Sequence, residues 1–157
     1  MANKLLQLDQ AVMLVDRLRA QGRTVVFTNG VFDILHPGHI RSLQLARAQG
    51  DALLVGVNSD RSVKALKGPS RPINPEQERV EVLAALRCVD GVVIFDEDDP
   101  QRVISRLQPD ILVKGGDWAA DRIVGRETVE ARGGKVVRVP VFEGHSTSAI
   151  IKKIRGL

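Results

Sequence analysis

Apolar residues occur along the chain in short blocks, separated by segments rich in charged residues, glycine and proline. Blocks of a few Val, Ile and Leu residues are typical of strands that are buried on both faces of a parallel sheet. Between the blocks, apolar residues return at every third or fourth position, as on one face of an amphipathic helix. The pattern therefore predicts that strands and helices alternate. The five predicted strands are Val25–Phe27, Leu53–Val57, Val92–Phe95, Ile111–Val113 and Val136–Val139.

Local signals predict where several helices begin and end. Asn74-Pro75 indicates a helix start, with Asn as the N-cap, Pro at the first position and Gln77 three residues after the cap. Asp99-Pro100 repeats this device, and Gly133-Gly134 predicts the end of a helix that begins near Asp121. The apolar residues of an opening helix within residues 1–22 are Leu8, Val12, Val15 and Leu18.

The repeated strand–helix–strand order predicts an α/β fold, a Rossmann-like, doubly wound, five-stranded parallel sheet with helices on both faces. With 157 residues, we expect a single domain over residues 1–157, made of the N-terminal helix and a catalytic core at 24–155. Ligands of such sheets bind beyond the carboxyl ends of the strands, where the strand order reverses. The polar or glycine-rich segments after the strands are Thr28–His39, Asn58–Asp60, Asp96–Asp99, Lys114–Trp118 and Pro140–Ser148.

Composition narrows the classes of partner. A net charge of +4 and a pI of about 9.6 suit anionic ligands such as phosphates. Only five aromatic residues are present, which leaves little for base stacking, so we expect no nucleic-acid partner. No apolar run approaches the roughly 20 residues that span a bilayer, so we expect no membrane contact. A lone cysteine, Cys88, and the lack of a signal-peptide pattern favour a cytoplasmic location.

The segment Thr28–His39 combines a strand end, a glycine turn and a helix start. Pro37 suits the first helical turn because its missing N–H is not needed there. His36 and His39 lie three residues apart, so both rings can lie on one face near the free N–H groups of that turn. The context favours phosphate binding over a chance pair or a simple helix cap.

A second helix start, Gly144–Ser148, precedes a predicted final helix at Ala149–Ile154. Free N–H groups and the helix dipole favour an anion there, and small hydroxyl residues add donors. On its own, Ser146-Thr147-Ser148 is equally well explained as an ordinary N-cap. Together, the two helix starts could hold a polyphosphate from two sides.

Other nucleotide and catalytic motifs are missing from the sequence. It contains no G-x-G-x-x-G after the first strand, no G-x-x-x-x-G-K-[ST] and no G-x-S-x-G. Zinc needs three or four ligands, so the two histidines alone do not predict a metal site. Judged singly, Lys67 and Arg79 are typical of solvated surface residues, and Asp117-Trp118 is typical of a turn.

Gly30-x-Phe32-Asp33-x-x-His36-x-Gly38-His39, with Gly144-His145-Ser146-Thr147, resembles the nucleotidylyltransferase superfamily with the H-x-G-H signature, which is cytidylyltransferase-like. The closest likeness is to its heptose 1-phosphate adenylyltransferase branch, in the stand-alone version rather than the one fused to a sugar kinase. The further segments that carry this resemblance are Asn58–Asp60, Lys67–Pro75, Arg79, Pro109-Asp110, Lys114–Asp117 and Ile150–Ile154. Ser148 and His145 depart from the residues common in the family.

The resemblance implies transfer of AMP from ATP to D-glycero-β-D-manno-heptose 1-phosphate, giving ADP-heptose and pyrophosphate for lipopolysaccharide synthesis, with Mg²⁺ arriving on ATP. It implies that His36, His39, Lys67 and Thr147 act on the phosphates. It further implies that Arg79 neutralises phosphate charge, that Asp33 sets the turn or touches substrate, and that Asp117 lies near the ribose. The remaining residues expected at the nucleotide are Thr28, Asn29, Gly30, Phe32, Gly38, Lys114, Gly115, Ser146 and Ser148.

Alternatives stay open at this point. A cytidylyltransferase acting on glycerol 3-phosphate would share the fold and mechanism, and ATP is preferred over CTP only through the resemblance. A non-catalytic nucleotide-binding module and an RNA-binding domain belong to different classes; intact His36 and His39 argue against the first and scarce aromatics against the second. The resemblance also implies a homo-oligomer, a dimer or tetramer.

Overall fold

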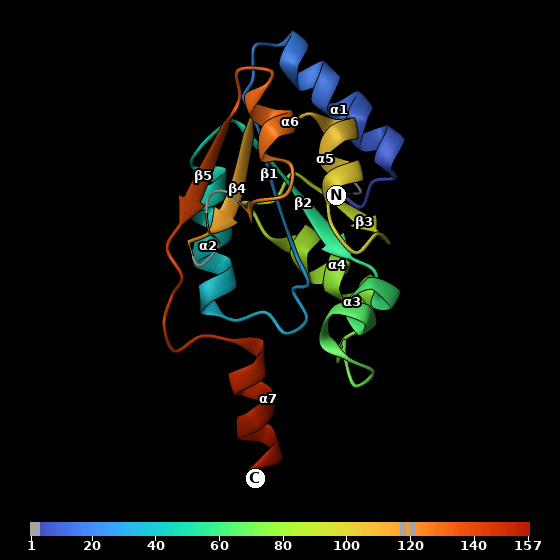
Figure 1. Cartoon of the computed structure of the whole chain (residues 1–157), viewed down its shortest axis with the longest axis vertical. Helices are drawn as coiled ribbons and strands as arrows, with labels where there is room; N and C mark the ends of the chain where they lie inside the picture. The colour runs from blue at the N-terminus through green and yellow to red at the C-terminus, as the bar shows by residue number, and fades with distance from the viewer. Residues whose placement is uncertain (1–3, 117–118, 120–121) are drawn as a thin grey trace.

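The computed structural model describes residues 4–116, 119 and 122–157, and it contains a five-stranded parallel sheet (Figure 1). The strand order is β3-β2-β1-β4-β5, and every neighbouring pair is parallel. All five predicted strands are therefore confirmed, and their observed bounds are one to three residues longer than the apolar blocks. The strands are β1 (Val25–Gly30), β2 (Ala52–Asn58), β3 (Gly91–Phe95), β4 (Ile111–Gly115) and β5 (Lys135–Val139).

Helices cover both faces of the sheet, as expected for a Rossmann-like fold. Alternate residues of β1 show the division, because Val25 and Phe27 pack into one core cluster and Val26 into the other. The helices of the first cluster are α1 (Leu8–Ala20), α5 (Gln101–Leu107) and α6 (Arg126–Glu130). The helices of the second are α2 (Pro37–Arg47) and α4 (Glu76–Ala85).

Two helix boundaries differ from the prediction. Helix α4 begins at Glu76 with Pro75 at the N-cap position, so Asn74 does not cap it. The Asn74 amide instead donates to the Asp33 carbonyl, and this tertiary contact replaces the local cap. Helix α5 departs from the prediction in the same way, because it begins at Gln101 with Pro100 at the N-cap position; Asp99 still accepts a hydrogen bond from the N–H of Gln101 at 2.8 Å.

The prediction was also wrong about α6, which begins at Arg126 rather than near Asp121; residue 121 itself lies outside the described residues. Gly133 ends the helical segment as expected, because its φ of 80° allows the left-handed turn that follows it. Helix α3 (Asp60–Lys67) was not predicted. Ser59 caps it by accepting from the N–H of Ser62, and Lys67 is its last residue.

The strand order reverses between β1 and β4, which places the switch point at the centre of the sheet. Pairing of these strands covers only Val26–Phe27 against Ile111–Leu112, whereas β1 pairs with β2 over its whole length. The two strands thus separate toward their carboxyl ends and leave space for a ligand.

The final helix, α7 (Thr147–Arg155), extends away from the layers of the sheet (Figure 1). None of its residues is buried, and Ile154 is 60% exposed. Within the part of the chain that the structure describes, no helix is long and apolar enough to cross a membrane.

Candidate active site

A cavity of about 480 Å³ opens at the carboxyl ends of β1, β4 and β5, and this volume suits a small-molecule ligand. The starts of α2 and α7 and the end of α3 also reach it. Fourteen of the sixteen predicted site residues line this cavity. They are Thr28, Asn29, Gly30, Phe32, Asp33, His36, Gly38, His39, Lys67, Lys114, Gly115, Ser146, Thr147 and Ser148.

The start of α2 forms one wall of the cavity. His36 is the N-cap, and its Nδ1 accepts from the N–H of His39 at 3.4 Å. Pro37 follows at the first helical position, as predicted. The two imidazole rings stack with centroids 3.8 Å apart, and His39 also packs against Phe32 at 5.3 Å. The two histidines therefore act as one rigid unit on the cavity wall.

Glycine at position 38 accommodates a close approach between the two helix starts. A Cβ there would lie 3.0 Å from both the His145 Cβ and the His36 Nδ1. His145 continues the ring stack, with its centroid 6.2 Å from that of His36 and an interplanar angle of 16°. Gly38 thus allows the segment that leads into α7 to lie against the start of α2.

Burial and mutual repulsion keep the histidines neutral. Burial and, to a smaller extent, the neighbouring His36 lower the pKa of His39 to about 4, although the Ile34 carbonyl opposes the shift. The pKa of His36 is also lowered, by burial and by His145. The buried Nδ1 of His39 makes no hydrogen bond with the described residues. At neutral pH, these rings offer N–H donors to a phosphate rather than full positive charges.

The start of α7 forms the facing wall. The Ser146 hydroxyl caps the helix by accepting from the N–H of Ala149 at 3.1 Å, so the N-cap explanation is confirmed. The Thr147 hydroxyl donates to the Ile34 carbonyl at 3.1 Å, which fastens α7 to the segment between β1 and α2. The Ser146 hydroxyl proton and the free N–H groups of the first turn remain for a ligand.

Polar side chains bridge the gap where β1 and β4 separate. The Thr28 hydroxyl donates to the Val113 carbonyl at 3.0 Å, and the Lys114 ammonium donates to the Asn29 amide oxygen. Burial lowers the pKa of Lys114 to about 8. Lys114 therefore stays mainly cationic at neutral pH and places a positive charge at the floor of the cavity.

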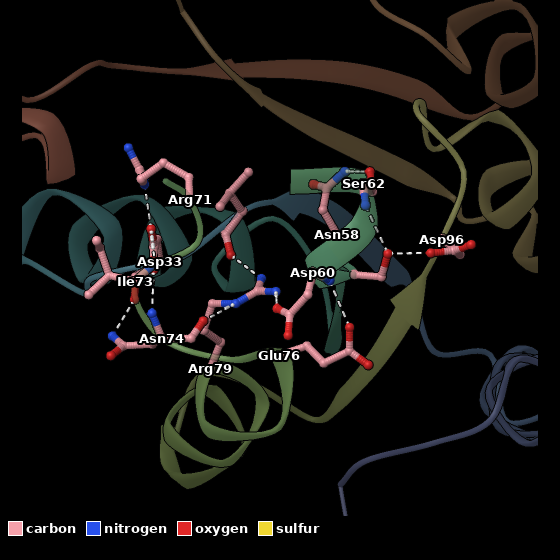
Figure 2. Close-up of polar contacts among 12 residues, drawn as sticks. Asp33, Asn58, Asp60, Ser62, Arg71, Ile73, Asn74, Glu76, Arg79 and Asp96 are labelled. Atoms are coloured by element: carbon pink, nitrogen blue, oxygen red, sulfur yellow. Dashed lines mark hydrogen bonds and ion pairs between the residues drawn. The ribbon is translucent and has the colours of Figure 1, made fainter. Parts of the chain in front are cut away.

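Asp33 connects the turn after β1 to the segment between α3 and α4 through hydrogen bonds. Its carboxylate accepts hydrogen bonds from the N–H groups of Ile73 and Asn74 and from the Arg71 guanidinium (Figure 2). Burial alone would raise the pKa of Asp33, but these donors hold it below its usual value. Of the two roles expected for Asp33, the structure supports setting the turn, because both carboxylate oxygens are already engaged.

Arg79 is a correction to the prediction, because it lies outside the cavity. Its side chain is 0% exposed and donates to the Asn74 carbonyl, the Val31 carbonyl and the Asp60 carboxylate (Figure 2). With its donors used inside the protein, it braces the cavity wall instead of neutralising phosphate. It is also not the surface residue that its sequence context indicates. The remaining predicted residue, Asp117, lies outside the described residues.

Sequence reasoning did not assign three charged or aromatic residues of the cavity, which are Arg71, Phe142 and His145. Arg71 reaches it from the segment between α3 and α4, and His145 reaches it from the segment before α7. The chain has only three histidines, and all three line this cavity. The rarity of histidine was therefore a signal that could have drawn attention to His145. Arg71 lies within the Lys67–Pro75 segment that carries the family resemblance, but its place at the cavity depends on the buried Asp33.

Comparison with known families agrees with this geometry. The family model described as cytidylyltransferase-like matches residues 27–153, which include both helix starts. The chain belongs to the cytidylyltransferase-like family. Membership of this family makes the chain a nucleotidyltransferase, which confirms the predicted enzyme class.

Several curated relatives of this cytidylyltransferase-like chain carry the name bifunctional protein HldE. The protein from Hyphomonas neptunium is 59% identical over 149 residues, which are 95% of this chain and 31% of the relative. The protein from Citrifermentans bemidjiense is 54% identical over 152 residues, covering 97% of this chain and 31% of the relative. The chain thus spans about a third of the length of these relatives.

Solved structures show similar architectures. A lipopolysaccharide core biosynthesis protein from Thermoplasma volcanium is 31% identical, with a TM-score of 0.64, and the match covers 79% of this chain and 100% of that one. A pantoate-β-alanine ligase from Francisella tularensis, 15% identical over 99% of this chain and 79% of its own, has a TM-score of 0.66. The ligase likeness concerns the fold alone.

Proposed function

We propose that this cytidylyltransferase-like chain transfers AMP from ATP to D-glycero-β-D-manno-heptose 1-phosphate, forming ADP-heptose and pyrophosphate for the lipopolysaccharide core. The observation that carries the proposal is the meeting of two helix starts, at His36–His39 and Ser146–Ser148, on one cavity. Such starts bind anions, and a nucleoside triphosphate needs donors along its length. The name of the similar lipopolysaccharide core biosynthesis protein supports an acceptor that belongs to lipopolysaccharide synthesis.

The chemistry proposed needs no general base. A phosphate monoester has a second pKa of about 6, so the sugar 1-phosphate is already a dianion near pH 7. One of its oxygens attacks the α-phosphorus of ATP, and the bond from that phosphorus to the bridging oxygen breaks. Pyrophosphate leaves with the electron pair. This suits a cavity whose histidines are neutral and stacked rather than paired with a carboxylate.

The residues of the cavity supply alignment and charge stabilisation. His36 and His39 would donate hydrogen bonds to oxygens of the reacting phosphoryl group, where negative charge grows in the transition state. Ser146, with the N–H groups at the start of α7, would hold the leaving pyrophosphate. Lys114 adds a buried positive charge at the cavity floor, near the nucleotide.

Magnesium fits this site as part of the substrate. Among the described residues that line the cavity, Asp33 is the one carboxylate, and internal hydrogen bonds engage both its oxygens. Mg²⁺ commonly takes most of its ligands from substrate phosphates and water. ATP would therefore bring the ion, which neutralises the phosphates when bound.

A pyrophosphate-release screen tests the proposal. Four nucleoside triphosphates with Mg²⁺ are crossed with heptose 1-phosphate, other sugar 1-phosphates and glycerol 3-phosphate. We expect the highest kcat/KM with ATP and heptose 1-phosphate. A preference for CTP with glycerol 3-phosphate would replace the proposed substrates and leave the phosphoryl-transfer mechanism standing. No release with any acceptor would contradict the catalytic proposal itself.

A further inference from the structure

The segment between α3 and α4 carries an arginine whose geometry is set by a buried acid. The Nε of Arg71 donates to Asp33 Oδ2 at 2.6 Å, and the two side chains are 14% and 1% exposed. Asp33 also accepts from the N–H groups of Ile73 and Asn74, so it holds the backbone that follows Arg71 as well. Figure 2 shows this cluster, with the end of the Arg71 side chain directed away from Asp33. The guanidinium is therefore fixed before any substrate binds.

The pairing with Asp33 uses only part of the guanidinium. An arginine side chain has five N–H donors, and the contact with Asp33 engages the single one on Nε. Within the described part of the chain, the two terminal Nη groups make no other hydrogen bond, and Arg71 lines the cavity. Two parallel N–H groups on a fixed plane match the geometry of a phosphate.

The topology separates this arginine from the elements proposed to hold the nucleotide. The strands β4 and β5 lie on one side of β1, whereas the segment with Lys67 and Arg71 follows β2, which lies on the other side. Apart from the Lys114 cation at the end of β4, the elements proposed to hold the nucleotide offer neutral donors, such as the Ser146 hydroxyl. The segment that follows β2 offers two cations, Lys67 and Arg71. The phosphate of a small dianion is attracted more strongly by two cations than by neutral donors.

We infer that Arg71, oriented by Asp33, binds the phosphate of the acceptor, a sugar 1-phosphate dianion, rather than the nucleoside triphosphate. This inference rests on the proposed function. Bound in this way, the acceptor phosphate lies across the cavity from the start of α7, and its charge is partly neutralised while it approaches a second anion. Asp33 acts as a positioning residue, because it touches the arginine and not the substrate.

The kinetic test compares Arg71→Ala, Arg71→Lys and a control, Arg61→Ala. Arg61 also pairs with an aspartate, Asp96, but it is 58% exposed and lies outside the cavity. We expect Arg71→Ala to raise KM for heptose 1-phosphate about 10- to 100-fold, as for loss of a charge-assisted hydrogen bond, with KM for MgATP unchanged. In Arg71→Lys the rise in KM should be smaller but still present, since lysine keeps the charge and lacks the planar pair of N–H donors. Arg61→Ala should behave as wild type.

Two further measurements separate binding from loosening of the segment. Guanidinium ion added to Arg71→Ala should restore part of the turnover, which a purely structural role would not allow. Calorimetric titration with heptose 1-phosphate and with glycerol 3-phosphate, in the presence of a non-hydrolysable ATP analogue, should show weaker binding to Arg71→Ala than to wild type. An equal rise in both KM values, or unchanged binding of both phosphates, would overturn the inference. If wild type binds these phosphates through Arg71 but releases no pyrophosphate, the proposed function fails and the inference stands.

Discussion

The two helix starts that meet at the cavity are built in different ways. The start of α2 belongs to the body of the protein, where His36 and His39 stack on each other and the His39 ring packs at a tilt against Phe32. The start of α7 is attached at its edge, through the Thr147 hydroxyl and the His145 ring, and the helix beyond it has no buried residue. One wall of the site is thus preorganised by the core, whereas the other depends on a few contacts.

The largest effect should come from the preorganised wall. We expect His39→Ala to lower kcat in the pyrophosphate-release assay about 10²- to 10³-fold, because it removes a donor to the charge that develops in the transition state. His145→Ala at the other wall is the matched control and should cost no more than about tenfold. Equal losses in the two variants would mean that both walls are preorganised to the same degree. Thermal unfolding of each variant checks that the fold is retained.

The contact between the walls can be disturbed at Gly38. The added Cβ of Gly38→Ala would press on His36 and His145, so one ring must move by a few tenths of an ångström or more. We expect kcat/KM to fall about 10- to 100-fold, as is typical when a catalytic group is misplaced. Pro37→Ala, at the exposed neighbouring position, should change kcat/KM far less. A Gly38→Ala enzyme with wild-type kinetics would show that the stack is not needed.

A smaller effect should follow from loosening the attachment of α7. Thr147→Val removes the hydrogen bond to the Ile34 carbonyl at nearly constant volume. We expect KM for MgATP to rise about three- to tenfold, since one neutral hydrogen bond contributes about 1 kcal/mol. Limited proteolysis before α7 should become faster. Thr147→Ser keeps the hydroxyl and should restore both properties; if it does not, the methyl group rather than the hydrogen bond holds the helix.

The smallest effect on turnover at neutral pH is expected from the acid stability of the preorganised wall, which changes only below pH 6.5. The unfolded chain protonates His39 near pH 6.5, whereas the folded chain does so only near pH 4. Between these values the unfolded state binds more protons, so the free energy of unfolding should fall as the pH is lowered from 6.5 to 4. The slope from this group cannot exceed about 1.4 kcal/mol per pH unit, the limit for one proton. Urea denaturation of wild type and His39→Asn should show a flatter profile for the variant; identical profiles would contradict the assignment.

The fold was predictable because its signals are local and repeated. Blocks such as Leu53–Val57 are apolar throughout, as a strand buried on both faces must be, and Pro37 and Asp99 mark helix starts through chemistry within one turn. Helix α3 was missed because it has only eight residues, and its few apolar side chains stand among charged ones. The shortened α6 shows that a terminating glycine pair fixes where a helix ends and not where it begins.

The site was predictable to the extent that its residues lie next to strand ends or helix starts. His36, His39 and Ser146 satisfy this condition, and the cavity contains them. Arg79 does not, because its environment depends on carbonyls and a carboxylate from three separate segments. Long-range partners of this kind convert a presumed surface arginine into a buried brace, and no local pattern records them.

The hydrogen bond between Thr147 and Ile34 joins residues that are 113 positions apart in the chain. Contacts of such high sequence separation form late in folding, because closing a long loop costs entropy before any contact repays it. The site is therefore complete only when nearly the whole length from β1 to α7 has found its place. Recovery of turnover during refolding would report this last step, after the circular dichroism of the parallel sheet and its helices has already returned.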